Sequence, residues 1–117
     1  MPANRLLVGY RKGIGIYDFA AAAATPLPPA GVALDVASFN DAACDAMGRL
    51  WIGTRHRDAS EPVAALYCVE AGRPARRVVD GVTVSNGIAF SLDGRTMYHT
   101  DSRPGRIDAY SYDGARG

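Results

Sequence analysis

The chain has 117 residues, of which 48% are hydrophobic and 21% charged, and its formal net charge is +1. These values are ordinary for a globular protein of about one domain. The 13 basic residues form no long cluster, so we expect no nucleic-acid partner. No apolar run approaches the ~18 residues of a membrane-spanning helix, and no secretion signal opens the chain. We therefore expect a cytoplasmic protein with no membrane partner.

Short apolar runs separated by glycine- and proline-containing turns follow one another along the whole chain. This pattern predicts β-strands joined by tight turns, with helices nearly absent. The alanine run at 20–24 is too short for a stable helix and precedes several prolines, so we expect a connection with at most one helical turn. The expected strands cover residues 6–10, 14–18, 32–36, 43–45, 50–54, 65–69, 77–79, 87–91, 96–100 and 107–112.

The two cysteines, Cys44 and Cys68, both lie in apolar, strand-like surroundings. A free thiol in such surroundings behaves as a small hydrophobic side chain. We expect both to be free thiols in a reducing compartment, and the alternative is a single disulfide.

An internal repeat gives more information than the individual strands. The segment Gly48-Arg49-Leu50-Trp51 and the segment Gly94-Arg95-Thr96-Met97 occupy matching places 46 residues apart. A period of ~40–50 residues with about four short strands is typical of a β-propeller blade. The chain would hold about two and a half blades, whereas propellers close with ~4–8. We therefore expect either a longer full protein or self-association through the open blade faces.

Polar residues stand at equivalent points of the two repeats, Asn40-Asp41 in one and Ser85-Asn86-Gly87 in the other. In a propeller these points lie on the innermost strands, which face the central channel. Amide and carboxylate oxygens are hard ligands that suit Ca²⁺ or Mg²⁺. The other interpretation is that these residues are ordinary turn formers.

Two longer motifs surround these points. Residues 40–54 resemble a family stretch that reads N-D-G and then D-x-x-G-R-x-W-x-G-T. Residues 84–102 resemble S-N-G-[IL]-x-[FW]-S-x-D-x-x-x-[ML]-Y-x-x-D-[ST]. Both are typical of the gluconolactonase/regucalcin (senescence marker protein) family, and the likeness runs from about residue 6 to residue 113. It implies an all-β fold in which residues 1–117 form one partial domain of a six-bladed β-propeller.

The resemblance also implies a function. Family members are calcium-dependent lactonases, hydrolases that open sugar or small lactones by metal-assisted attack of water. By position Asn86 matches a metal ligand, with Ca²⁺ expected and Zn²⁺, Mg²⁺ or Mn²⁺ as alternatives. Asn40 matches a substrate-contacting asparagine, and Asp58 falls near an acidic loop residue over the mouth of the channel. No residue here matches the family's glutamate ligand or its aspartate ligand and base, so no catalytic residue is assigned.

Two departures from the family pattern bear on function. Ser38 stands where many relatives have a sugar-binding arginine, and Ala42 replaces a glycine, so a different or smaller lactone becomes an option. The alternative to an enzyme is a non-catalytic truncated propeller module that self-associates or binds a partner. A third candidate is another six-bladed scaffold, of the strictosidine-synthase or lipid-lactonase kind. His56 and His99 have no spaced partner and are expected to be structural.

Overall fold

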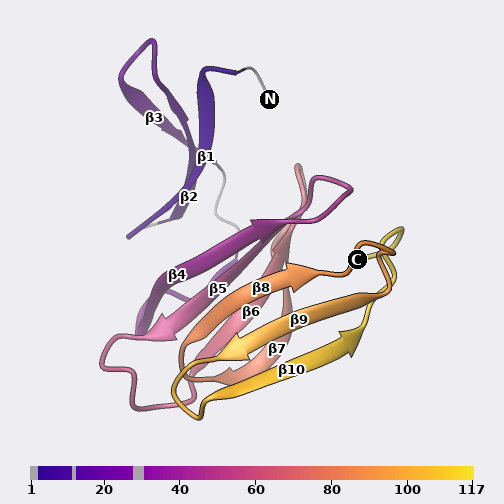
Figure 1. Cartoon of the computed structure of the whole chain (residues 1–117). Coiled ribbons are helices and arrows are strands. Elements are labelled where there is room, and N and C mark those ends of the chain that lie inside the picture. The colour runs from indigo at the N-terminus through magenta and orange to yellow at the C-terminus, as the bar shows by residue number, and fades with distance from the viewer. Residues whose placement is uncertain (1–2, 12, 28–30) are drawn as a thin grey trace.

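The computed structural model describes residues 3–11, 13–27 and 31–117, and every regular element in these ranges is a β-strand (Figure 1). The all-β prediction is therefore confirmed. Within the described ranges no helix is long and apolar enough to cross a membrane. The ten strands are β1 (Arg5–Tyr10), β2 (Gly13–Asp18), β3 (Ala23–Pro26), β4 (Ala37–Cys44), β5 (Leu50–His56), β6 (Ala64–Val69), β7 (Arg76–Val82), β8 (Ser85–Phe90), β9 (Thr96–Asp101) and β10 (Arg106–Ser111).

The strands form three antiparallel sheets in which neighbours along the chain are neighbours in space. The orders are β1-β2-β3, β4-β5-β6-β7 and β10-β9-β8. The middle sheet has four strands and its neighbours have three each, which agrees with about two and a half blades. Each sheet is a meander of tight hairpins, the simplest arrangement for short strands separated by glycine turns.

The middle sheet is buried on both faces because its central strands carry apolar side chains along most of their length, through the first half of β5 and all of β6. In β5 and β6, side chains alternate between the two faces of the sheet. One set packs with Ile14 of β2 and consists of Leu50, Ile52, Ala65 and Tyr67. The other set packs with Ile88 of β8 and Met97 of β9 and consists of Trp51, Leu66 and Cys68. The three sheets therefore stack face to face, as consecutive propeller blades do.

Two of the predicted elements are wrong. The predicted strand at 32–36 is not a strand; the strand begins at Ala37 and runs through the polar segment to Cys44, because that segment pairs with β5. The alanine run does not form a helical turn. Asp18 Oδ1 instead accepts hydrogen bonds from the backbone N–H groups of Ala20 (2.9 Å) and Ala21 (3.2 Å), and the turned chain forms β3 against β2.

The cysteine prediction is partly confirmed. Both thiols are free, and Cys68 is buried in the core between the second and third sheets. Cys44 is exposed at the end of β4, which is an edge strand of its sheet. Its expected role as a small hydrophobic side chain is therefore wrong.

Candidate functional site

A β-bulge interrupts the first strand of each of the last two sheets at the polar motif. In β4 the register shifts between Phe39 and Ala42, so that Asn40 and Asp41 lie in the bulge. In β8 it shifts between Asn86 and Ala89. Both strands are edge strands of their sheets. A bulge leaves backbone groups out of the ladder and redirects side chains, and bulges are frequent next to functional sites.

Hydrogen bonds join the two bulges across neighbouring sheets. Asn40 Nδ2 donates to the Ser85 carbonyl oxygen at 2.9 Å. The Gly87 N–H donates to Asp41 Oδ2, also at 2.9 Å. The chain therefore brings Asn40 and Asn86, which the sequence places 46 residues apart, onto adjacent strands. Asp41 Oδ1 accepts a hydrogen bond from the Ala42 N–H within its own strand at 2.9 Å, while Oδ2 holds the strand of the neighbouring sheet.

Asn86 is half-buried and makes two polar contacts within its own sheet. Its Nδ2 donates to Ser102 Oγ at 3.1 Å, and its Oδ1 accepts from the Gly87 N–H at 3.1 Å. A carbonyl oxygen can accept two hydrogen bonds, so Asn86 Oδ1 keeps one lone pair for another group. Among the described residues, Asn40 Oδ1 accepts no hydrogen bond. Two amide oxygens with free capacity thus lie on neighbouring strands.

Gly87 is glycine for a reason that the sequence did not reveal. Its φ of +50° lies in the left-handed region, which disfavours other residues. A Cβ atom at this position would also lie 2.7 Å from Thr100 Oγ1 on β9. A side chain at this position would therefore clash within the protein itself.

Asp58 lies in the exposed turn that follows β5. His56 shapes this loop, because its Nδ1 accepts hydrogen bonds from the backbone N–H groups of Ser60 (3.4 Å) and Glu61 (3.2 Å). The Arg57 N–H donates to the Val36 carbonyl oxygen at 3.4 Å, which holds the loop at the end where β4 begins. No hydrogen bond within the described part of the chain joins Asp58 to either asparagine.

The oxygens gathered at the bulges match calcium in kind and not in number. Asn40, Asn86 and Asp41 present hard oxygen donors, whereas Ca²⁺ takes about 6–8. Across residues 3–11, 13–27 and 31–117, no group of three or more His, Cys, Asp or Glu side chains could hold a metal ion. These residues alone therefore do not form a complete calcium site.

A buried serine–histidine pair lies directly behind the asparagines, and the sequence did not indicate it. Ser85 Oγ lies 2.7 Å from His99 Nε2, and both side chains are almost fully buried. Burial lowers the pKa of His99, and the nearby carboxylates of Asp101 and Asp108 only partly oppose this effect. The only signal available beforehand was the position of His99 in a strand opposite the Ser85-Asn86 segment.

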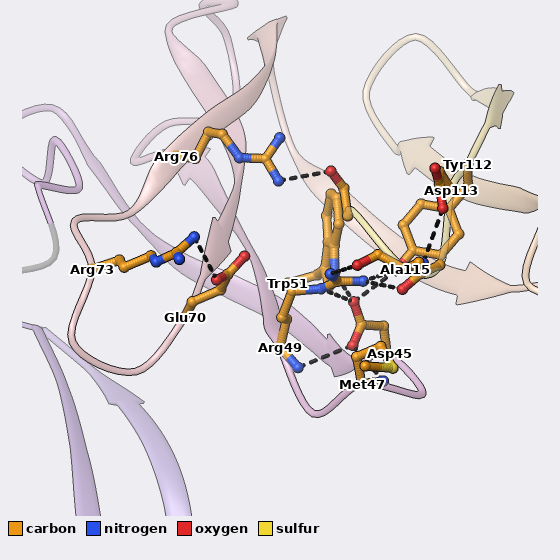
Figure 2. A network of polar contacts seen from close by, with 12 residues as sticks. Asp45, Met47, Arg49, Trp51, Glu70, Arg73, Arg76, Tyr112, Asp113 and Ala115 are labelled. Atoms are coloured by element: carbon orange, nitrogen blue, oxygen red, sulfur yellow. Dashed lines mark hydrogen bonds and ion pairs between the residues drawn. The ribbon is translucent and has the colours of Figure 1, made fainter.

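A second polar cluster, the Asp45 network, lies at the other end of the interface between the second and third sheets (Figure 2). Asp45 Oδ2 accepts hydrogen bonds from Arg49 Nε (2.6 Å), Trp51 Nε1 (3.0 Å) and the Tyr112 hydroxyl (2.7 Å). Its Oδ1 accepts from the backbone N–H groups of Met47 and Arg49, both at 3.0 Å. We define the network as Asp45, Arg49, Trp51 and Tyr112.

The charge of Asp45 is stabilised by these donors. Burial acts to raise the pKa of Asp45, but the hydrogen bonds from Tyr112, Trp51 and Arg49 outweigh it and hold the pKa well below its ordinary value. Arg49 also donates to the Gly114 carbonyl oxygen at 2.6 Å, so the guanidinium joins the β4–β5 turn to the segment after β10. A carboxylate with so many donors has little capacity left for a ligand, and the network is structural.

Face-to-face antiparallel sheets with bulged edge strands define the chain as part of a β-propeller, and comparison with known proteins agrees. The solved structure of a regucalcin from Agrobacterium tumefaciens, described as a calcium-binding protein, superposes with a TM-score of 0.85 at 26% identity, covering 97% of this chain and 38% of that one. The solved structure of a luciferin-regenerating enzyme gives a TM-score of 0.78 at 28% identity, with 97% and 40% coverage.

Sequence comparison identifies the family. The model of the SMP-30/Gluconolactonase/LRE-like region matches residues 1–117. A Bacillus subtilis protein provisionally named sugar lactone lactonase YvrE is 37% identical over 75 residues, which is 64% of this chain and 26% of that protein. Regucalcin of Danio rerio is 39% identical over 77 residues, again 64% and 26%. The chain belongs to the SMP-30/gluconolactonase/LRE-like family, and it spans about a quarter of the length of these two relatives.

Proposed function

We propose that the chain provides part of the metal and substrate site of a lactone-hydrolysing propeller. In this proposal Asn86 is one ligand of a divalent cation, with calcium the expected ion, and Asn40 and Asp58 contact the lactone. The observation that carries the proposal is that two bulged edge strands of neighbouring sheets, one carrying Asn40 and the other Asn86, are hydrogen-bonded to each other. Family membership and the names of the lactonase and regucalcin relatives support it.

Because these residues hold only part of the site, hydrolysis of gluconolactone by residues 1–117 within a protein extended at both ends to a complete propeller, with added calcium and with a chelator, tests the proposal. We expect calcium-stimulated hydrolysis that the chelator abolishes. Replacing Asn86 by alanine should lower the rate at least about tenfold, as loss of a group that holds a metal site usually does. Asn4→Ala is the matched control, because Asn4 lies in the turn before β1 and, among the described residues, hydrogen-bonds only through its backbone carbonyl oxygen. A rate of hydrolysis that changes neither with the chelator nor with Asn86→Ala would contradict the proposal.

A second candidate function is a non-catalytic module that self-associates. Two observations favour it: the described residues lack a complete metal-ligand cluster, and large apolar side chains are exposed on the outer sheets, such as Phe19 (61%) and Ile107 (71%). Sedimentation equilibrium distinguishes the candidates. A mass that rises with concentration, together with no lactone hydrolysis at any calcium concentration, would favour the module over the enzyme.

A further inference from the structure

Ser85 occupies a space that exists only because the facing residue is glycine. Gly53 of β5 lies against Ser85 of β8, and a Cβ atom on Gly53 would lie 1.8 Å from Ser85 Oγ and 2.4 Å from Ser85 Cβ. Gly53 has no positive φ, so the requirement here is for space and not for backbone conformation. The two sheets therefore approach each other too closely for a Cβ atom at the residue that precedes Asn86.

His99 holds the Ser85 side chain in that space. The 2.7 Å contact between Ser85 Oγ and His99 Nε2 satisfies two polar groups that are 0% and 1% exposed. A buried polar group that loses its partner costs free energy, so each residue keeps the other in place. The full burial of Ser85 also excludes it as a nucleophile toward a substrate.

The backbone of Ser85 connects this pair to both asparagines. Its carbonyl oxygen accepts the hydrogen bond from Asn40 Nδ2 at 2.9 Å, and its peptide continues directly into Asn86. Ser85 pairs with Asp101 on β9, and Asn86 pairs with Thr100. A displacement of Ser85 would therefore move the partner of Asn40 and the backbone of Asn86 together.

We propose that the buried pair Ser85 and His99, accommodated by Gly53, positions Asn40 and Asn86 relative to each other across the two sheets. Both are positioning residues that act through the Ser85 backbone. This inference rests on the proposed function for the roles of the two asparagines. The positioning itself is a property of the fold and can be measured without any lactone.

The composition of the chain allows a direct measurement. It contains three asparagines, Asn4, Asn40 and Asn86, and no glutamine, so a ¹⁵N-labelled sample shows three side-chain NH₂ pairs in its NMR spectrum. In Ser85→Ala we expect the Asn40 and Asn86 pairs to shift and the Asn4 pair to stay. Hydrogen exchange at Asn40 Nδ2 should become about fivefold faster, because its hydrogen bond is weakened. His99→Leu, which leaves Ser85 in place without its partner, should produce the same two shifts.

Two further variants separate positioning from general loss of stability. His99→Gln keeps an amide that can reach the Ser85 hydroxyl, and it should leave both asparagine pairs near their original positions while adding a fourth pair. Tyr112→Phe removes a hydrogen bond from the Asp45 network at the far end of the same interface and should shift neither pair. The proposal is overturned if Ser85→Ala and His99→Leu leave both pairs unmoved, or if Tyr112→Phe moves them equally. Because no readout depends on hydrolysis, failure of the enzymatic proposal remains a separate result.

Discussion

The interface between the β4–β7 sheet and the β8–β10 sheet has two polar ends that differ in how completely their groups are satisfied. At the Asp45 end, one buried carboxylate accepts five hydrogen bonds, from two backbone N–H groups and three side chains. At the asparagine end, Asn40 and Asn86 are more accessible, and their amide oxygens retain acceptor capacity. Both ends use polar residues to join the same two sheets.

This difference in hydrogen bonding distinguishes polar residues that stabilise the interface from polar residues that are available to a ligand. A buried group with every acceptor site occupied stabilises the interface and has no lone pair left for a ligand. An accessible group with a free lone pair contributes less to stability and can bind something else. We therefore expect substitutions at the Asp45 end to act on stability, and substitutions at the asparagine end to act on binding.

The largest effect is expected from Asp45→Ala. The change leaves the Arg49 guanidinium and the Trp51 N–H without their shared acceptor in a buried setting, so the free energy of unfolding should fall by about 3–5 kcal/mol. Urea denaturation followed by tryptophan fluorescence measures this, since Trp51 is the only tryptophan. Asp35→Ala, at an exposed loop position, should change it by less than about 0.5 kcal/mol. Equal losses of unfolding free energy in Asp45→Ala and Asp35→Ala would show that the Asp45 network does not stabilise the interface.

Gly53→Ala should have the next largest effect. The added methyl group forces Ser85 or its strand to move, and such overpacking costs about 1–3 kcal/mol. Gly13→Ala is the matched control in another strand, because a Cβ there would lie 3.6 Å from its nearest neighbour, the Tyr10 hydroxyl. Adding Ser85→Gly to Gly53→Ala should recover part of the loss. A neutral Gly53→Ala would show that the close approach of the two sheets is not required.

A smaller effect is expected from pH. Burial lowers the pKa of His99 in the folded chain below its ordinary value of 6.5, so the unfolded chain binds the proton first as the pH falls. The stability contributed by His99 is therefore complete above pH 6.5 and is lost as the pH falls through the folded-state pKa. Urea denaturation at a series of pH values should show this decline, and His99→Gln should remove it. His56→Gln, at the only other histidine, should retain it.

The smallest effect on stability is expected from Asn86→Ala. The lost contacts with Ser102 and Gly87 are partly exposed, so the free energy of unfolding should fall by less than about 1 kcal/mol. The same variant should lose most of its calcium-dependent hydrolysis, and thermal denaturation alongside the lactone assay measures both. A destabilisation as large as that of Asp45→Ala would assign Asn86 to the structural group.

Much of the fold follows from local sequence, because glycine turns and apolar runs act over a few residues. The repeat at Gly48 and Gly94 correctly predicted consecutive blades. Only the end of the strand at 37–44 was predicted, because the polar residues Ser38, Asn40 and Asp41 interrupt its apolar pattern and pairing with β5 makes the segment a strand. The β3 strand was missed for a similar reason, since an alanine run has no strand propensity of its own and gains it from β2.

The candidate site likewise has a part that the sequence motifs predicted and a part that depends on how the sheets pack. The motifs predicted roles for Asn40 and Asn86, and those roles stay predictions; the structure places the two residues on β4 and β8, edge strands of neighbouring sheets. The cross-sheet contacts behind them were not predictable, because Asp41 with Gly87 and Gly53 with Ser85 depend on how two sheets dock. The Asp45 network was equally hidden, since Tyr112 lies 67 residues along the chain from Asp45. The sequence showed Asp45 only as a turn residue.

The most direct test of the central claim is a calcium titration of the ¹⁵N-labelled chain followed on its three asparagine NH₂ pairs. If Asn86 is a ligand of the cation and Asn40 lies beside it as a lactone contact, the Asn86 signals should move most, the Asn40 signals less, and the Asn4 signals not at all. Because the described residues supply only part of the coordination shell, half-saturation is expected in the ~millimolar range. Signals of Asn40 and Asn86 that stay fixed, or three pairs that drift equally, would contradict the account.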